Sequence, residues 1–149
     1  HAHPRYDSLQ PRYSLAARQE FERELEPVCL EQGIGVIPYS PLAAGFLTGK
    51  YRRGRPLPES GRAEAVKRMY LNDWGFNLID RVDEVARAHS SSPAQVSLAW
   101  LLARPSITSP ITSANTVEQW EDLSKATDLE LSVEDIQRLN QASEPTASA

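Results

Sequence analysis

The sequence lacks the cysteines of a disulfide-rich fold, since Cys29 is the single cysteine among 149 residues. One cysteine cannot form an internal disulfide, and we expect Cys29 to be a buried structural thiol on a helix. No apolar run approaches the roughly 20 residues that a membrane-spanning helix needs, and residues 1–5 contain no signal-peptide core. These absences predict a cytoplasmic protein with no membrane partner.

A strong excess of charge of one sign is also lacking. Sixteen Lys and Arg oppose 20 Asp and Glu, and the formal net charge is -4 with both signs interspersed. Such a surface carries no basic stripe to follow a phosphate backbone, so nucleic acid is not an expected partner. His1 and His3 offer only two metal ligands on a chain terminus, which is too few for a stable site, and no metal is predicted.

The pattern that is present is that of one α/β domain covering residues 1–149, with a mobile tail at 145–149. Residues 6–9, 34–37 and 107–112 are strand candidates, although Pro110 interrupts the last of them. Helical patterns lie between the strand candidates, an alternation that predicts a parallel sheet with helices packed outside it.

The helical patterns carry clear boundary signals. Residues 19–32 have apolar positions at helical spacing, with Pro27 either kinking or restarting the helix and Gly33 ending it. Residues 77–89 form a second helical pattern. Three further helices are predicted to begin at the capping sequences Ser92-Pro93-Ala94-Gln95, Thr116-Val117-Glu118-Gln119 and Ser132-Val133-Glu134-Asp135. We expect one apolar face on each, and packing roles for Trp74, Trp100 and Trp120.

The loop that follows residues 34–37 is the first candidate for a binding site. In parallel α/β folds, ligands bind where loops leave the carboxyl ends of strands. A flat ring could stack on Tyr39 and an anion could meet Lys50. Residues 43–62 read as one long loop, of a length typical of functional lids, in which we interpret Arg52, Arg53 and Arg55 as solvated charges.

Several motifs together resemble the aldo-keto reductases, and most resemble the bacterial branch that is also similar to potassium-channel β subunits. They are spread over residues 6–143. The motifs are Gln10-x-x-Tyr13, Phe21-Glu22-Arg23-Glu24-Leu25, Gly35-Val36-Ile37-Pro38-Tyr39-Ser40-Pro41-Leu42-Ala43-x-Gly45-x-Leu47-Thr48-Gly49-Lys50-Tyr51, Ser92-Pro93-Ala94-Gln95-x-x-Leu98-Ala99-Trp100-Leu101-Leu102 and Ala114-Asn115-Thr116-x-x-Gln119.

The resemblance implies a (β/α)8 barrel of the TIM type, a fold of about 250 residues. This chain would be its C-terminal half, with residues 6–9, 34–37 and 107–112 as strands six to eight. The family's catalytic Asp, Tyr, Lys and His lie on the first four strands, and no motif here matches them. No catalytic residue is therefore assigned.

The resemblance also implies a binding floor for NADP, with NAD not excluded. Gln10 would bind the nicotinamide carboxamide, and Tyr39 would stack on the nicotinamide ring. The pyrophosphate and phosphate contacts would come from Ser40, Pro41, Leu42, Ala43, Gly45, Lys50 and Arg62, and the adenosine contacts from Ser113, Asn115, Gln119 and Asp122. Asn115 stands where the family often has Arg, and a neutral amide cannot pair with a 2′-phosphate as a guanidinium does. Gln119 can instead act as a helix cap.

The implied function is the cofactor-binding part of a reductase that transfers hydride to aldehydes or ketones. A small carbonyl substrate would be its partner once an N-terminal half completes the barrel. Without that half, we expect the chain to be inactive. The alternative is a non-catalytic half-barrel that associates with itself or with another chain through its open edge.

Overall fold

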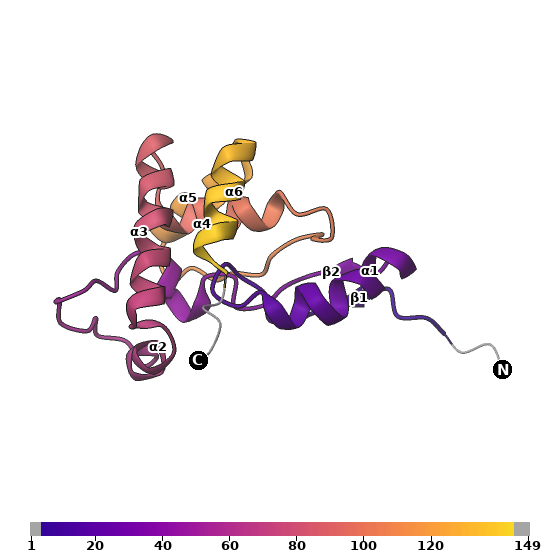
Figure 1. Cartoon of the computed structure of the whole chain (residues 1–149), viewed down its shortest axis with the longest axis horizontal. Coiled ribbons are helices and arrows are strands. Elements are labelled where there is room, and N and C mark those ends of the chain that lie inside the picture. The colour runs from indigo at the N-terminus through magenta and orange to yellow at the C-terminus, as the bar shows by residue number, and fades with distance from the viewer. Residues whose placement is uncertain (1–3, 145–149) are drawn as a thin grey trace.

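The computed structural model describes residues 4–144, and the tail predicted at 145–149 lies outside them. Two short strands, β1 (Ser8–Leu9) and β2 (Gly35–Val36), pair in parallel, with Ser8 opposite Gly35 and Leu9 opposite Val36. The strands and α1 (Glu26–Gln32) lie at one end of the molecule, and α2 (Ala63–Tyr70) lies at the other (Figure 1). The predicted parallel pairing of the first two strand candidates is confirmed.

The prediction of a third strand at residues 107–112 is wrong. Ile107 makes only an isolated parallel bridge to Val36. The Val36 N–H donates to the Thr108 Oγ1 atom at 3.1 Å rather than to a backbone carbonyl, although Thr108 and Ile111 still donate their N–H groups to the carbonyls of Val36 and Pro38. Pro110 has no N–H to continue the ladder. The segment therefore lies beside β2 without forming a regular strand.

The chain between the two strands shows how Pro27 is accommodated in a helix. A π-helical turn, Phe21–Leu25, precedes α1, and Pro27 occupies the first turn of α1, where a missing N–H costs nothing. Gly33 ends α1 with a left-handed φ of 60° and donates its N–H to the Cys29 carbonyl. The predicted helix and its end at Gly33 are confirmed, and Pro27 lies where the helix restarts as α1.

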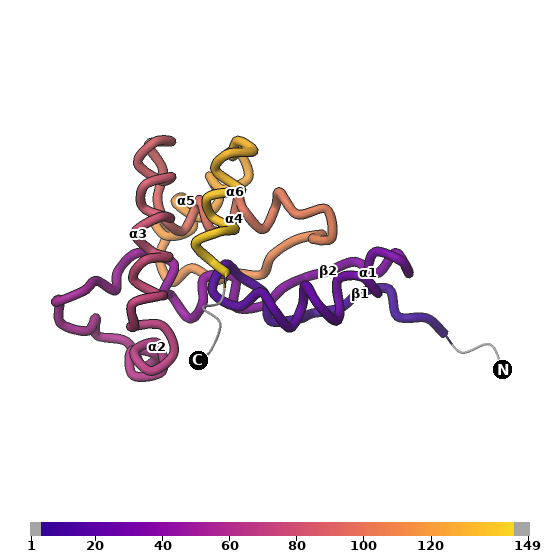
Figure 2. The backbone as a smooth tube through the Cα atoms, in the orientation of Figure 1, coloured from indigo at the N-terminus to yellow at the C-terminus, as the bar shows by residue number. Residues whose placement is uncertain are grey.

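The remaining helices stack together above the strands (Figure 2). They are α3 (Asp73–Ala88), α4 (Pro93–Leu102), α5 (Val117–Ser124) and α6 (Val133–Ala142), with 3₁₀ turns at Ala43–Thr48 and Lys125–Thr127. Helix α4 packs against α3 and α5, and α6 packs against α3. The turn Ala43–Thr48 was not expected, because the sequence analysis read residues 43–62 as one loop, and no helix was assigned to the residues of α2.

The three predicted caps are present. Ser92, Thr116 and Ser132 each accept the N–H of the residue three positions later. The predicted single apolar face of α4 is wrong, because every residue from Ala94 to Leu101 is buried while Leu102 is 38% exposed. Most of these residues are apolar, and a helix with apolar residues on most of its faces is enclosed by its neighbours. Helix α4 is therefore the centre of the helical layer.

Two further expectations about side chains are corrected. Trp100 is fully buried and Trp74 is partly buried against the core, but Trp120 is 63% exposed on α5 and anchors no packing. The predicted apolar faces of α5 and α6 are partly wrong as well, since Val117 and Val133 are 66% and 74% exposed. An apolar residue in the first helical turn can face water when the helix end projects from the core.

The basic cluster is also more ordered than expected. Arg52 forms a bidentate ion pair with Asp83 on α3, and Arg53 pairs with Asp73 at 2.8 Å while its guanidinium lies over the Phe76 ring. Arg53 and Arg55 fit the prediction of solvated charges, since the Arg53 side chain is 63% exposed, whereas Arg52 does not. The Arg52–Asp83 pair joins the chain after the 3₁₀ turn to α3.

Candidate functional site

The chain beyond β2 continues the parallel pairing and then turns sharply. Ile37 and Tyr39 donate their N–H groups to the carbonyls of Leu9 and Pro11, both at 2.9 Å. Tyr39 thus stands at the carboxyl end of the sheet, where its side chain is 47% exposed. The next residue, Ser40, has a left-handed φ of 56° and redirects the backbone.

The loop has further left-handed residues. Ala43, Ala44 and Gly45 have φ values of 49°, 57° and 91°. A left-handed conformation costs a residue with a side chain roughly 1–2 kcal/mol, so the surrounding packing must hold this backbone in place. Phe46 and Leu47, both fully buried, anchor the loop on the core. Such strain is typical of loops that hold ligands.

A groove of about 970 Å³ opens beside this loop. Four segments far apart in sequence line it: the loop itself, residues 60–62 before α2, Ala94 at the start of α4, and the chain from residue 111 into α5. Eleven of the thirteen predicted site residues lie along it: Tyr39, Ser40, Pro41, Leu42, Gly45, Lys50, Arg62, Ser113, Asn115, Gln119 and Asp122. The sequence analysis missed its other lining residues, Ala44, Thr48, Ser60, Gly61, Ala94, Ile111, Thr112 and Leu123. Most of these are sequence neighbours of predicted residues.

Two predicted residues do not line the groove. Ala43 is 2% exposed and belongs to the hydrophobic core beneath the loop. Gln10 is exposed and directly follows β1, at the same carboxyl edge of the sheet as Tyr39. The parallel register that joins Leu9 to Val36 and Arg12 to Tyr39 keeps Gln10 next to the groove rather than in its wall.

Two cations lie along the groove. The Lys50 side chain passes directly over Gly45, where a methyl group would come within 3.2 Å of its Cε and Nζ atoms. The Nζ atom lies 5.4 Å from the centre of the Tyr51 ring. Arg62 is exposed and occupies the N-cap position of α2 without a side-chain capping hydrogen bond. Both groups can reach an anion that lies on the loop.

The α5 side of the groove carries a fixed carboxylate. Asp122 accepts hydrogen bonds from Ser92 Oγ at 2.8 Å and Gln95 Nε2 at 2.6 Å, so each of its oxygens is bound to the start of α4. Gln95 therefore does not complete a capping box, as its spacing from Ser92 had suggested. Asp122 is held in one orientation, from which it can still accept a donor in the groove.

Gln119 does act as a capping residue. Its N–H donates to Thr116 Oγ1 at 3.2 Å, and its side-chain Oε1 accepts the Asn115 N–H at 2.9 Å. These bonds order the residues that lead into α5 and hold Asn115 at the groove. The capping role and the position in the groove are compatible for Gln119.

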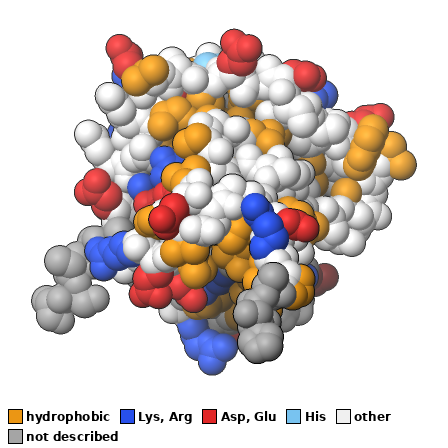
Figure 3. All heavy atoms as spheres, turned by 90° about the vertical axis from the view of Figure 1, so that its right-hand side faces the viewer, with side chains coloured by type: hydrophobic (Ala, Val, Ile, Leu, Met, Phe, Trp, Pro, Cys, Tyr) orange, Lys and Arg blue, Asp and Glu red, His pale blue; other side chains and the backbone are white. Residues whose placement is uncertain are grey.

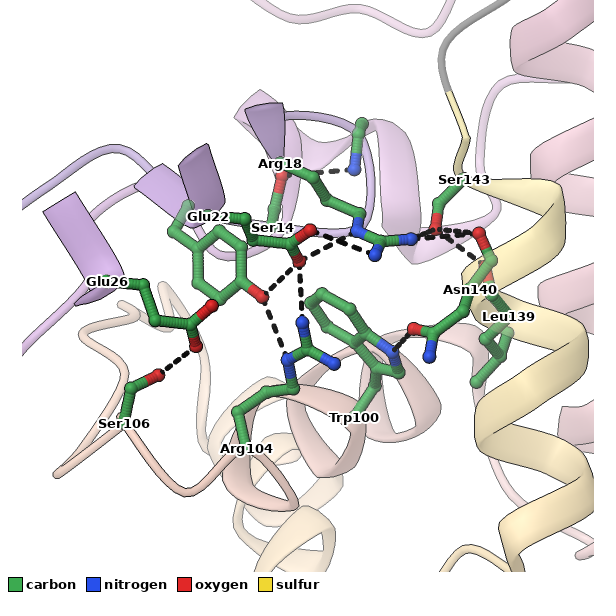
Figure 4. Close-up of polar contacts among 12 residues, drawn as sticks. Ser14, Arg18, Glu22, Glu26, Trp100, Arg104, Ser106, Leu139, Asn140 and Ser143 are labelled. Atoms are coloured by element: carbon green, nitrogen blue, oxygen red, sulfur yellow. Dashed lines mark hydrogen bonds and ion pairs between the residues drawn. The ribbon is translucent and has the colours of Figure 1, made fainter. Parts of the chain in front are cut away.

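A second polar cluster is centred on Glu22 (Figure 4), and none of its residues lines the groove. Glu22 accepts hydrogen bonds from Tyr13 Oη at 2.7 Å, from Arg18 Nε at 2.8 Å and from Arg104 Nη2 at 2.7 Å. Arg18 also donates to the Asn140 carbonyl and the Ser143 hydroxyl of α6 and its C-cap. The Glu22 cluster thus joins the chain after β1 to α6 and to the end of α4.

The ionisation of this cluster is fixed by its surroundings. Burial alone would raise the pKa of Glu22, but hydrogen bonds from Arg18 and Tyr13 and the charges of Arg18 and Arg104 outweigh it and lower that pKa. Burial and the hydrogen bond to Glu22 raise the pKa of Tyr13 well above its ordinary value. Every partner is satisfied and no open hollow is centred on Glu22, so we regard the cluster as structural.

Neither a metal site nor a reactive thiol is found in the part of the chain that the structure describes. No group of three or more His, Cys, Asp and Glu side chains there could hold a metal ion. Cys29 is buried, as expected, and burial raises the pKa of its thiol. Among residues 4–144, no helix is both long and apolar enough to cross a membrane.

Comparisons with known proteins identify the family. Residues 1–144 match the model of the Aldo/keto reductase family. The chain is 34% identical over 145 residues to a versiconal hemiacetal acetate reductase of Aspergillus parasiticus, a match that covers 96% of this chain and 42% of that protein.

Two further relatives are described as a different reductase and as a channel subunit. An L-glyceraldehyde 3-phosphate reductase of Escherichia coli O157:H7 is 31% identical over 138 residues, covering 89% of this chain and 40% of its own length. A probable voltage-gated potassium channel subunit beta of Arabidopsis thaliana is 34% identical over 127 residues, covering 80% and 38%. The chain spans about two fifths of the length of these relatives. It belongs to the aldo/keto reductase family of oxidoreductases.

Proposed function

We propose that the groove is the cofactor floor of an NAD(P)H-dependent carbonyl reductase. The observation that carries this proposal is the convergence of eleven predicted residues, from three separate segments, on one groove. Its residues suit a dinucleotide chemically. Tyr39 offers an exposed ring on which the nicotinamide could stack. The Lys50 side chain lies over Gly45 in the left-handed loop, where it could meet a phosphate. Hydrogen bonds order Asp122 and Gln119 at the α5 end of the groove.

In this proposal each segment binds one part of the cofactor. Tyr39 stacks on the nicotinamide ring and excludes water from one of its faces, while Gln10 binds the carboxamide. The loop from Ser40 to Gly45 lies along the pyrophosphate, with Lys50 and Arg62 balancing its charge. The bound cofactor would supply hydride to the carbonyl carbon of an aldehyde or ketone.

We further propose that the chain is the C-terminal half of a (β/α)8 barrel. Two observations support this placement: β1, β2 and the segment at residue 107 lie side by side in chain order, and the relatives are more than twice as long. By the family resemblance, the groove residues bind and orient the cofactor, whereas the proton donor to the carbonyl oxygen lies on the first four strands. Carbonyl turnover therefore requires the other half of the barrel.

Titration of the chain with NADPH and with NADH by isothermal calorimetry tests the cofactor floor. Tyr39→Ala and Lys50→Ala should each weaken binding about tenfold or more, because an aromatic stack or a charge-assisted hydrogen bond contributes roughly 1–3 kcal/mol. Arg55→Ala, an exposed cation outside the groove, is the matched control and should bind normally. Absence of binding by the unaltered chain would refute the proposal. If Asn115 disfavours a 2′-phosphate, NADH should bind at least as tightly as NADPH.

A second candidate function is self-association of a non-catalytic half-barrel. Hydrophobic side chains gather on the face toward the N-terminal end of the molecule (Figure 3). Tyr6, Val28 and Leu30 are 83%, 49% and 54% exposed, and within residues 4–144 strand β1 is paired on one side only. Sedimentation across a dilution series tests this candidate, and a compact monomer at every concentration would exclude it.

A further inference from the structure

A second hollow, of about 680 Å³, lies outside the groove and shares no lining residue with it. Its walls come from the chain after β1, from the N-terminus of α3 and from the end of α6. Arg12, Gln19, Asn72 and Trp74 are among its lining residues. We refer to it as the Arg12 pocket.

Arg12 places this pocket beside the proposed nicotinamide site. Arg12 and Tyr39 are partners in a parallel bridge, and residues opposite each other in a parallel ladder project to the same face of the sheet. The Arg12 guanidinium donates a hydrogen bond to the Tyr70 hydroxyl, a neutral partner that orients it. Within residues 4–144, no carboxylate lies within 4.0 Å of that guanidinium.

The lining holds one other cation and two carboxylates. Arg18 is paired with Glu22, and Asp73 makes a solvent-exposed pair with Arg53 at 2.8 Å. Glu20 is an exposed carboxylate in the pocket lining. Arg12 is therefore the lining cation with guanidinium donors still available to a ligand, since a guanidinium has five N–H groups and Arg12 uses one here.

The N-terminus of α3 adds backbone donors. Asn72 caps this 16-residue helix, and its Oδ1 accepts the Gly75 N–H at 2.9 Å. The amides of Asp73 and Trp74, in the first turn, have no acceptor within the helix, and the helix dipole favours an anion at this end. The Arg12 pocket thus combines an oriented guanidinium with a helix N-terminus, a pairing suited to phosphate or carboxylate.

We propose that the Arg12 pocket binds the anionic group, a phosphoryl or a carboxylate, of the carbonyl substrate. This inference rests on the proposed function, because it places the anion beside a nicotinamide stacked on Tyr39. The substrate would be a small aldehyde or ketone that carries a negative charge near its carbonyl. Arg12 would contact that charge, and Asn72 and Gln19 would supply polar contacts around it.

Calorimetry with glycerol 3-phosphate and with glycerol, at fixed ionic strength, tests the pocket on the whole chain. The two probes differ only in the phosphoryl group, so glycerol 3-phosphate should bind saturably and at least tenfold more tightly. Arg12→Gln should weaken glycerol 3-phosphate at least tenfold, whereas Arg55→Gln should leave it unchanged. Equal binding of the two probes, or equal effects of the two substitutions, would overturn the proposal.

A second substitution guards against a folding artefact. Asn72→Asp keeps a good helix cap but adds a negative charge to the pocket, so it should weaken glycerol 3-phosphate while circular dichroism stays native. A folded Asn72→Asp variant with unaltered binding would contradict the proposed location of the anion.

The same titrations separate the substrate from the cofactor as the source of the anion. Saturating NADPH should leave the glycerol 3-phosphate affinity unchanged, because the groove and the pocket share no residue. Competition between the two would assign the pocket to a phosphate of the cofactor and overturn the substrate inference. A third outcome is that the chain binds glycerol 3-phosphate but not NADPH. That result would refute the proposed function and the substrate assignment, and the pocket would remain an anion site.

Discussion

The Glu22 cluster and the loop at residues 40–45 differ in whether their polar groups are paired within the protein. In the cluster, Glu22, Arg18 and Arg104 are largely buried and each is bound to several partners. In the loop, strained backbone and an exposed Tyr39 ring border an open groove. The cluster has its hydrogen-bond partners inside the protein, whereas the groove leaves side chains available to a ligand. The first arrangement favours stability and the second favours binding.

The largest expected effect breaks the Glu22 cluster. Glu22→Ala leaves Arg18 and Arg104 without their shared carboxylate, and removal of one partner from a largely buried ion pair costs about 3 kcal/mol. Urea denaturation should show that loss in the free energy of unfolding. Glu24→Ala, an exposed carboxylate in the same turn, is the control and should change stability by less than about 0.5 kcal/mol. A similar loss in both variants would mean that the Glu22 cluster has no special role.

A smaller effect is expected in the groove, from Gly45→Ala. The φ of 91° is unfavourable for alanine, and the new methyl group would lie 3.2 Å from the Lys50 side chain. We expect a loss of about 2 kcal/mol in the free energy of unfolding and weaker NADPH binding, because Lys50 must move.

Gly61→Ala provides the comparison within the same groove, since no atom lies within 4 Å of the added methyl group. Its stability and its NADPH affinity should match those of the unaltered chain. If the two variants had the same stability and the same NADPH affinity, the left-handed backbone at Gly45 would contribute to neither.

The pH dependence of stability should also separate the two regions. The pKa of Glu22 is lowered in the folded state, so the unfolded chain binds more protons in acid. The stability that Glu22 contributes is complete above its ordinary pKa of about 4.3 and is lost as the pH falls through the lower, folded-state value.

Denaturation profiles between neutral and acidic pH measure this contribution. Glu22→Gln should flatten the acid side of the profile, leaving the part due to Asp135, whose pKa is held down against burial by Ser132 and His89. Lys50→Gln, in the groove, should leave the shape of the profile unaltered. An unaltered acid slope in Glu22→Gln would contradict the assignment.

The smallest expected effect is a gain in stability. Ala44 has a φ of 57°, and Ala44→Gly removes the side chain that opposes this conformation. The net gain should be about 0.5 kcal/mol after the greater backbone entropy of glycine in the unfolded chain is included. Ala94→Gly, at a groove-lining position inside α4, should instead lose about 1 kcal/mol. Thermal denaturation of the two variants measures the contrast.

The features that the sequence predicted well are those set by local chemistry. The caps Ser92, Thr116 and Ser132 were predictable because helix capping needs only a hydroxyl side chain that accepts the N–H three residues later. Gly33 was predictable because a helix end in the left-handed conformation favours glycine. Most of the groove residues were predicted from the family resemblance, which supplied what spacing alone could not.

The features that the sequence did not predict depend on the tertiary environment. Periodicity could not show that α4 is enclosed on every side, because that depends on its neighbours. The bidentate pairing of Arg52 with Asp83 joins residues 31 positions apart, so no local pattern indicates it. The Arg12 pocket was missed for the same reason, since α3 and the chain after β1 meet only in the folded structure.

Helix α4 links the two contrasting regions mechanically. Its N-terminal end lines the groove through Ala94 and holds Asp122 through Ser92 and Gln95. Toward its other end, Trp100 packs beneath the guanidinium of Arg104, a member of the Glu22 cluster. Ten helical residues form a rod about 15 Å long, too short to bend appreciably. Any rigid-body displacement of α4 at the Glu22 cluster would therefore also displace the wall of the groove.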